Sequence, residues 1–214
     1  MRWNLGLSYL AVLLGSVSGG IAADSSVFKD PETGFTFSEY AAAYAIGSSV
    51  TFRIAIPSPA TGAYDLVLQI IAPVAVGWTG IAWGGQMVYC PLTIGWLSGS
   101  TGVASVRRAT SHTAPSLYTG ATLQVLKTGT KTNGTHWQIT AKCSGCSSFV
   151  GSGTTNITLN ANGSNRLAFA YSKTKPSSAS SAATINVHDV YNYWDHDFAS
   201  AGNANFAQLV AQNA

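Results

Sequence analysis

The sequence predicts an all-β, antiparallel fold, built either as a sandwich or as a barrel. Short runs of β-branched and aromatic residues recur along the chain, and in several of them apolar and polar residues alternate. A period of two residues is typical of strands that bury one face. Clusters of Gly, Asn, Ser and Pro separate the runs, as expected for the turns of an antiparallel sheet. We find no segment with the apolar period of a convincing amphipathic helix.

Some runs carry the strand pattern most clearly. In chain order they are SSVTFRIAIP (48–57), YDLVLQIIAPV (64–74), WTGIAW (78–83), TLQVLKTG (122–129), HWQITAKC (136–143), NITLN (156–160) and RLAFAYS (166–172). The segment FSEYAAAYAI (37–46) stays open between a helical turn, an edge strand and a loop. The serine-rich KTKPSSASSAA (173–183) predicts a mobile surface loop. It is not expected to be a domain linker, because aromatic-rich sequence resumes after it.

The segment 1–23 has the layout of a secretory signal peptide. Arg2 precedes the apolar stretch YLAVLLGSV, and small residues follow around Ala22 and Ala23. Glycine and serine break this stretch, which falls short of the roughly 20 apolar residues that a membrane span needs. We therefore expect a secreted, extracellular protein with no membrane span, whose residues 24–214 form one domain.

The composition excludes several classes of function. The chain has 11 Lys and Arg against 8 Asp and Glu, only 9% charged residues, and no basic cluster that could hold phosphates. Nucleic acid is therefore not an expected partner. Walker, G-x-G-x-x-G, G-x-S-x-G and H-E-x-x-H motifs are absent from the sequence, and few acidic residues are available for a glycosidase pair. A self-contained hydrolase is not expected.

Three cysteines allow one disulfide with one thiol left over. The CSGC spacing of Cys143 and Cys146 suits a redox dithiol, half of a zinc site or a tight structural bridge. We favour the structural bridge, because no second pair of ligands stands at zinc spacing and an oxidising compartment keeps such a pair closed. Cys90, between Tyr89 and Pro91, is then predicted to be a buried free thiol.

Three Asn-X-Ser/Thr motifs predict glycosylation at Asn133, Asn156 and Asn162. Each motif lies in a stretch rich in Gly, Thr and Asn, which is typical of exposed turns. They agree with an extracellular surface.

A methionine and a set of histidines remain without an obvious packing role. Met87, one of two methionines, follows Gly84 and Gly85 in a break after an apolar run, whereas a packing methionine normally lies inside such a run. His188 and His196 lie in the aromatic-dense segment TINVHDVYNYWDHDF (184–198). Each histidine, taken alone, would usually be a packed or solvated side chain.

Taken together, these segments resemble one family. FKDPETGFTFSEY, GWTGIAWGGQMVYCPLTIGW, THWQITAKCSGCSSF, RLAFAYSKTKP and the late histidine segment occur in the order seen in the haem b cytochrome domain of fungal cellobiose dehydrogenases, within the DOMON superfamily. The resemblance covers essentially all of 24–214 and implies an antiparallel, immunoglobulin-like β-sandwich with a non-covalent haem b. Covalent attachment is not indicated, because no C-x-x-C-H motif is present.

The resemblance also implies the axial ligands of the haem iron. The methionine role falls on Met87. The histidine role falls on His188, because the family's ligand is followed, after eight intervening residues, by an Asp-[FY] pair, matched here by Asp197 and Phe198. His196 is the competing histidine. A thioether and an imidazole together favour ferrous iron and leave no open coordination position, which suits single-electron transfer. The glycines beside Met87 are expected to let the backbone approach the porphyrin face.

Other residues are assigned by the same resemblance. A family tyrosine that binds a haem propionate is replaced here by His112, with Tyr118 further on, and we assign the contact to His112. Aromatic residues that flank the ligands either form the apolar haem slot or belong to the sandwich core. They are Trp83, Tyr89, Trp96, Tyr191 and Trp194.

The implied function is that of an electron-transfer cytochrome without an independent catalytic site. The expected donor is a sugar dehydrogenase, and the expected acceptor is a copper polysaccharide monooxygenase, a ferric complex or a quinone. The chain stops at Ala214 without a flavin domain, so it is either free-standing or a piece of a longer flavocytochrome. Two alternatives stay open: a haem-free sandwich that binds carbohydrate through exposed aromatics, and a structural glycoprotein of the cell wall.

Overall fold

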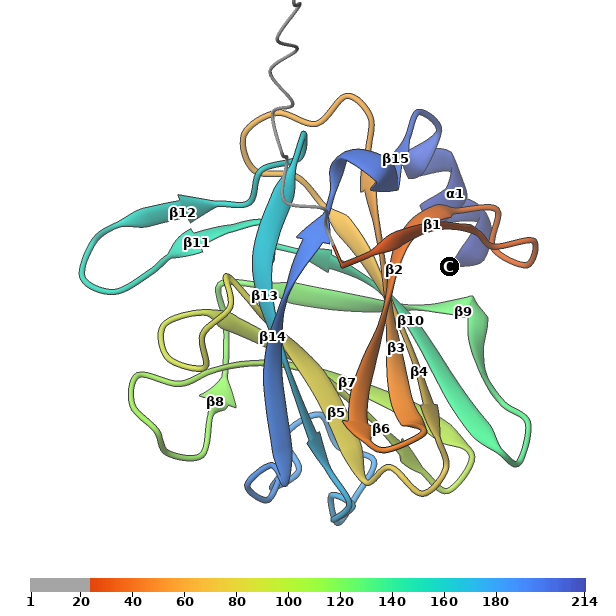
Figure 1. Ribbon diagram of the computed structural model, residues 1–214, viewed down its shortest axis with the longest axis vertical. Coiled ribbons are helices and arrows are strands. Elements are labelled where there is room, and N and C mark those ends of the chain that lie inside the picture. The colour runs from red at the N-terminus through yellow and green to blue at the C-terminus, as the bar shows by residue number, and fades with distance from the viewer. Residues whose placement is uncertain (1–23) are drawn as a thin grey trace, which may run out of the picture.

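The computed structural model describes residues 24–214, in which two sheets face each other, both antiparallel except for one short parallel pairing of β15 (Gly202–Asn203) with β3 (Ser48–Pro57) (Figure 1). The predicted leader at 1–23 lies outside the described residues. The first sheet contains, in spatial order, β1 (Ser26–Lys29), β2 (Thr36–Ala45), β3 (Ser48–Pro57), β4 (Leu66–Pro73), β10 (His136–Ser144) and β9 (Thr122–Thr132), and β15 (Gly202–Asn203) pairs with β3. The second contains β14 (Val190–Asp197), β13 (Ser164–Ser172), β5 (Trp78–Trp83), β6 (Pro91–Ser98), β7 (Thr101–Arg108) and β8 (Ser116–Leu117). The predicted β-sandwich is confirmed.

Smaller elements complete the chain. The hairpin of β11 (Ser148–Val150) and β12 (Asn156–Thr158) projects from one side of the sandwich, and a short 3-10 turn, η1 (Ala199–Ala201), precedes α1 (Phe206–Asn213) near the C-terminus (Figure 1). Among residues 24–214, no helix has the length and apolar character needed to cross a membrane.

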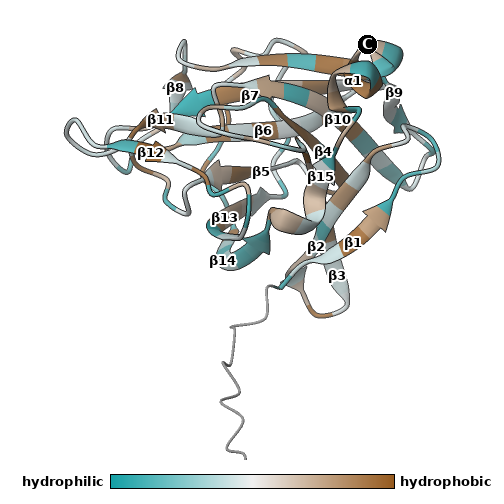
Figure 2. Cartoon of the chain, turned by 90° about the horizontal axis from the view of Figure 1, so that it is seen from above, coloured by the Kyte–Doolittle hydropathy of each residue, from teal (hydrophilic) through white to brown (hydrophobic). Residues whose placement is uncertain are grey.

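The main core lies between the two sheets, because alternate residues of each strand point inward. Trp83, Phe169 and Trp194 from the second sheet meet Phe52 and Trp137 from the first, and each is at most 2% exposed. In Figure 2, β4 and β5 are coloured mainly as hydrophobic. Burial on this scale stabilises the sandwich by roughly 1.5–3 kcal/mol for each large apolar side chain.

A second, smaller core lies on the outer face of the second sheet. Its members alternate along the strands with those of the main core and include Trp78, Leu92, Ile94 and Trp96, covered by Ala183 from the segment before β14. Both faces of the central strands of this sheet are therefore buried, which explains why β5 and β6 are mainly apolar and do not alternate with charged residues.

The structure settles one open segment and corrects one expectation about elements. Residues 37–45 of the segment left open, 37–46, belong to β2, which pairs with β1 on one side and β3 on the other and is therefore not an edge strand. The helix α1 was not expected from the sequence. It is only eight residues long and places Phe206 and Leu209 against Phe35, Phe37 and Leu126, so tertiary packing rather than a long apolar pattern stabilises it.

Candidate functional site

A trough crosses the outer face of the second sheet. The strand register aligns two rows of side chains that run perpendicular to the strands. One row is Tyr191, Ala170, Gly80 and Ile94, and the next is Tyr193, Ala168, Ala82 and Leu92. In both rows the two middle residues are small, so β13 and β5 form a low floor. Tyrosines on β14 and branched aliphatic residues on β6 form the walls, about 14 Å apart at three strand spacings.

Three separate segments close over this floor and carry residues that the sequence singled out. Met87 comes from the β5–β6 loop, His112 from the segment after β7, and His188 from the segment between β13 and β14. All three line one cavity of about 630 Å³ together with the floor residues. This volume lies within the range of about 300–1,000 Å³ that is typical of ligand and cofactor pockets. The structure therefore brings together, in one site, residues 101 positions apart in the sequence (87 and 188).

The cavity is suited to a large, flat, mainly apolar ligand. Most of its lining is aliphatic, aromatic or alanine, and four of its polar side chains, those of Gln86, His112, Thr113 and Asn186, are exposed. The indole of Trp78, which belongs to the lining and is 4% exposed, has no hydrogen-bond partner for its Nε1–H among residues 24–214. A buried donor without a partner is unusual, and a ligand with an acceptor group would satisfy it.

The loop that carries Met87 has a strained backbone. Gly84 and Gly85 have φ values of 106° and 75°, and Tyr89 has a φ of 63°, which is rare for a bulky residue. The peptide N–H of Tyr89 donates to the carbonyl of Ala109 at 2.8 Å and so fixes this turn. Met87 itself is half-buried and packs against the outer core.

The glycines of this loop do not have the role that the sequence suggested. Neither Gly84 nor Gly85 belongs to the cavity lining. A Cβ on Gly84 would come within 2.9 Å of the Phe149 ring and 3.0 Å of Cys90 Sγ, and a Cβ on Gly85 would come within 2.9 Å of Arg166. Glycine is required at both positions because φ is positive and because a side chain would collide with Phe149, Cys90 or Arg166. The two glycines therefore set the path of the loop that carries Met87.

The segment 173–189, which we call the strap, is anchored by side chains of the sheet beneath it. Trp96 Nε1 donates to the carbonyl of Ser178 at 3.0 Å, and Ser105 Oγ donates to the carbonyl of Ser181 at 2.7 Å. At its far end, Asp189 Oδ2 accepts the peptide N–H of Lys173 at 2.7 Å. The sequence predicted a mobile surface loop here. These contacts depend on tertiary structure, and they hold the strap over the trough.

The two competing histidines occupy different environments. His188 is half-buried in the cavity wall, where its ring meets Tyr191 edge to face at a centroid distance of 5.1 Å. His196 is fully buried inside β14, and its Nδ1 accepts the indole N–H of Trp194 at 2.9 Å. Burial lowers the pKa of His196 to about 4, so the ring is neutral at neutral pH. His196 does not line the cavity.

The aromatic residues that flank the ligands in sequence are mostly not at the site. Trp83, Trp96 and Trp194 are buried in the two cores, and only Tyr191 of the five lines the cavity. Tyr118 also points elsewhere, since the guanidinium of Arg108 lies 5.3 Å from its ring centroid. His112 is exposed at the rim of the cavity. The small residues of the floor, which are Gly80, Ala82, Ala168 and Ala170, were not identified from the sequence. They occupy alternate positions in GIAW (80–83) and LAFA (167–170), so small residues repeated every second position were the available signal.

The cysteines are arranged as predicted, away from the cavity lining. Cys143 and Cys146 form a disulfide with their Cα atoms 5.8 Å apart, at the end of β10. Cys90 is a free, buried thiol, and burial raises its pKa. The side chains of Asn133, Asn156 and Asn162 are all exposed at the surface.

Comparisons with known proteins agree on one family. The family described as the cytochrome domain of cellobiose dehydrogenase matches residues 28–208. A pyrroloquinoline quinone-dependent pyranose dehydrogenase of Coprinopsis cinerea is 33% identical over 153 residues, which are 71% of this chain and 19% of that enzyme, so the chain spans about a fifth of its length.

Two solved structures share the fold. The cytochrome b domain of pyranose dehydrogenase from Coprinopsis cinerea superposes with a TM-score of 0.77 at 27% identity, covering 88% of this chain and 95% of that domain. The cytochrome domain of Myriococcum thermophilum cellobiose dehydrogenase superposes with a TM-score of 0.79 at 22% identity, covering 90% of this chain and 98% of that domain. The second likeness supports the fold alone.

Proposed function

Since this chain belongs to the family of cytochrome domains of cellobiose dehydrogenase, we propose that its outer trough binds haem b without a covalent bond and that the domain transfers single electrons. The observation that supports this most strongly is the convergence of Met87 and His188 on one apolar cavity with a floor of small side chains. A flat macrocycle needs such a floor, because a larger side chain on β5 or β13 would fill the space.

Each residue then has a defined role. Met87 Sδ and an imidazole nitrogen of His188 would hold the haem iron, and Tyr191 supports the His188 ring by its edge contact. His112, which is exposed in the cavity lining, would bind a haem carboxylate, and the unpaired indole N–H of Trp78 would donate to an acceptor group of the bound cofactor. Bound haem supplies a one-electron ferric/ferrous couple, whose potential is raised by a thioether ligand.

The proposed partners follow from the family. The donor is a flavin- or quinone-dependent sugar dehydrogenase, either joined to this domain or separate from it. The acceptor is a copper polysaccharide monooxygenase, a ferric complex or a quinone. With Met87 and His188 both holding the iron, neither partner would need to reach it. The domain would exchange electrons through the exposed side of the site at Tyr191 and Tyr193, which are 58% and 44% exposed.

The proposal includes an extracellular location. Cleavage after residue 23 and glycans on Asn133, Asn156 and Asn162 would follow from secretion, and all three side chains are exposed. Mass spectrometry of the secreted protein before and after enzymatic deglycosylation tests both points. Unmodified asparagines and an intact residue 1 would contradict them.

Absorption spectroscopy of protein produced with ample haem tests the function. We expect the sharp reduced α and β bands of a six-coordinate b-type haem, lost in His188→Ala. His136→Ala is the matched control, because His136 is exposed at the start of β10 and lies outside the cavity lining. A colourless wild-type protein would refute the cytochrome function and favour carbohydrate binding by the exposed pair Tyr191 and Tyr193. Loss of haem in both variants would refute the role of His188.

A further inference from the structure

One buried cation stands beside the cavity and is not used by the proposed chemistry. Arg107 lies on β7 in the same row as Leu92 of the trough wall and is only 5% exposed. No carboxylate forms an ion pair with it among residues 24–214. Burial lowers the pKa of this guanidinium. A buried charge without a counter-ion is destabilising unless hydrogen bonds compensate for the lost hydration.

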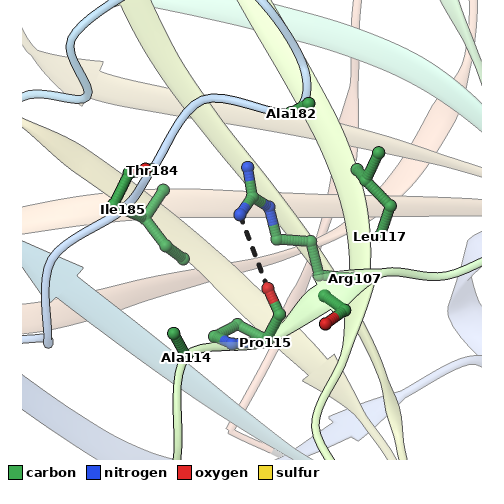
Figure 3. Close-up of a pocket in the computed structure, with 8 residues that line it drawn as sticks. Arg107, Ala114, Pro115, Leu117, Ala182, Thr184 and Ile185 are labelled. Carbon is green, nitrogen blue, oxygen red and sulfur yellow. Dashed lines mark hydrogen bonds between the residues drawn. The ribbon is translucent and has the colours of Figure 1, made fainter.

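The compensation comes from two segments that have no regular structure of their own. Arg107 Nη2 donates to the carbonyls of Ser181, at 2.8 Å, and Ala183 in the strap. Arg107 Nη1 donates to the carbonyl of Pro115, in the segment that follows His112, at 3.5 Å (Figure 3). Arg107 Nε donates to Ser105 Oγ on the same strand at 3.0 Å. One planar group therefore binds the strap through two short hydrogen bonds and reaches the His112 segment, across β7, through a longer and weaker one.

This junction is adjacent to the proposed haem cavity. Arg107 lines a second, open pocket of about 490 Å³, and Figure 3 shows Arg107 between Pro115 on one side and Ala182, Thr184 and Ile185 on the other. Ala114, Pro115 and Ile185 line both cavities. Ile185 lies three residues before His188, and Pro115 three residues after His112. A shift of either segment at Arg107 would therefore move a predicted cofactor contact.

We propose that Arg107 is a positioning residue, whose guanidinium fixes the strap and the His112 segment at the separation in which the haem is held. The haem part of this inference rests on the proposed function. A fixed separation matters because an axial ligand on a loosely held loop must be ordered when the cofactor binds, and that ordering weakens binding. Lysine cannot replace the planar guanidinium, since a single ammonium group cannot donate at the same time to carbonyls of both segments.

Hydrogen exchange of the haem-free full chain tests the first half of the inference. Arg107→Met should accelerate amide exchange over 181–189 by about tenfold or more, because local opening of the strap no longer breaks charged hydrogen bonds. Arg108→Met is the matched control. Arg108 Nη2 donates to the carbonyl of Val150, so this variant should accelerate exchange in the β11–β12 hairpin and leave 181–189 unchanged.

Haem titration tests the second half. In Arg107→Met the dissociation constant should rise about 10-fold to 100-fold, as is typical when a group that orients a metal ligand is removed. Arg107→Lys should be intermediate. If Arg107→Met does not fold, Ser105→Ala should shift both measurements in the same direction by less, since Ser105 contacts the guanidinium and the strap.

Two results would overturn the inference. Unchanged exchange over 181–189 in Arg107→Met would show that the strap is fixed by other contacts, and unchanged haem affinity with faster exchange would show that the strap does not control the cofactor. Failure of the proposed function is distinguishable, because a wild-type protein that binds no haem would leave the exchange result in the haem-free chain intact.

Discussion

Acidification from pH 7 to pH 5 should destabilise the fold through His196. In the folded chain this histidine is fully buried and burial holds its pKa at about 4, whereas in the unfolded chain the pKa returns to the ordinary value of 6.5. Between these values the unfolded chain binds more protons than the folded chain. The contribution of neutral His196 to the free energy of unfolding is therefore nearly complete above about pH 6.5, and it is lost progressively as the pH falls toward 4.

The magnitude follows from the two pKa values. Their difference corresponds to about 3 kcal/mol in full, and about 2 kcal/mol of this is lost between pH 7 and pH 5. For a domain of this size, a loss of about 2 kcal/mol lowers the melting temperature by about 4–8 °C. The window above pH 5 is useful because most carboxylates remain ionised there.

Urea unfolding of the haem-free protein at several pH values between 7 and 5 measures the effect. His196→Asn is the informative variant, since its amide oxygen can still accept the indole N–H of Trp194, but the side chain does not titrate. The variant will be less stable at every pH because it leaves space in the core, so the comparison is between slopes. A wild-type slope equal to that of His196→Asn would refute the assignment of the pH dependence to His196.

Three further outcomes test the site and the framework. Met87→His should retain haem and lower its reduction potential, measured by redox titration, because a second imidazole replaces the soft ligand that favours ferrous iron; an unchanged potential would exclude Met87 as a ligand. Ala168→Leu should place a larger side chain on the floor of the trough and weaken haem binding in a titration. The melting temperature of the haem-free chain should change little. Full haem affinity in this variant would show that the cofactor does not lie on this floor. Replacing Cys143 and Cys146 together by serine should remove about 2 kcal/mol of stability, which would lower the melting temperature by several degrees. The rate of electron transfer to an external acceptor should stay nearly the same. A large fall in that rate in folded, haem-loaded protein would assign the pair a redox role.

Much of the site could be predicted from local sequence. Met87 stood out because a flexible thioether followed two glycines, and the structure does place it in the cavity wall. His188 was separable from His196 only through the resemblance to a family, because both lie in the same aromatic segment. Their difference in burial arises from β14, which begins at Val190 and so leaves His188 in the strap while enclosing His196 in the sandwich.

The sequence by itself determined the all-β class of fold, the disulfide and Met87 as a candidate, since strand periodicity, cysteine spacing and an unusual methionine are all local signals. The choice of His188 as the second candidate ligand came from the resemblance to a family. Tertiary structure alone decided the trough, the anchored strap and the position of Arg107. The trough exists because the register of four strands places small residues in adjacent rows, and register is a relation between segments far apart in the chain. The strap is ordered for the same reason: its own serines and alanines provide little to hold it, and its partners are Trp96, Ser105 and Arg107 on strands that precede it by more than 70 residues.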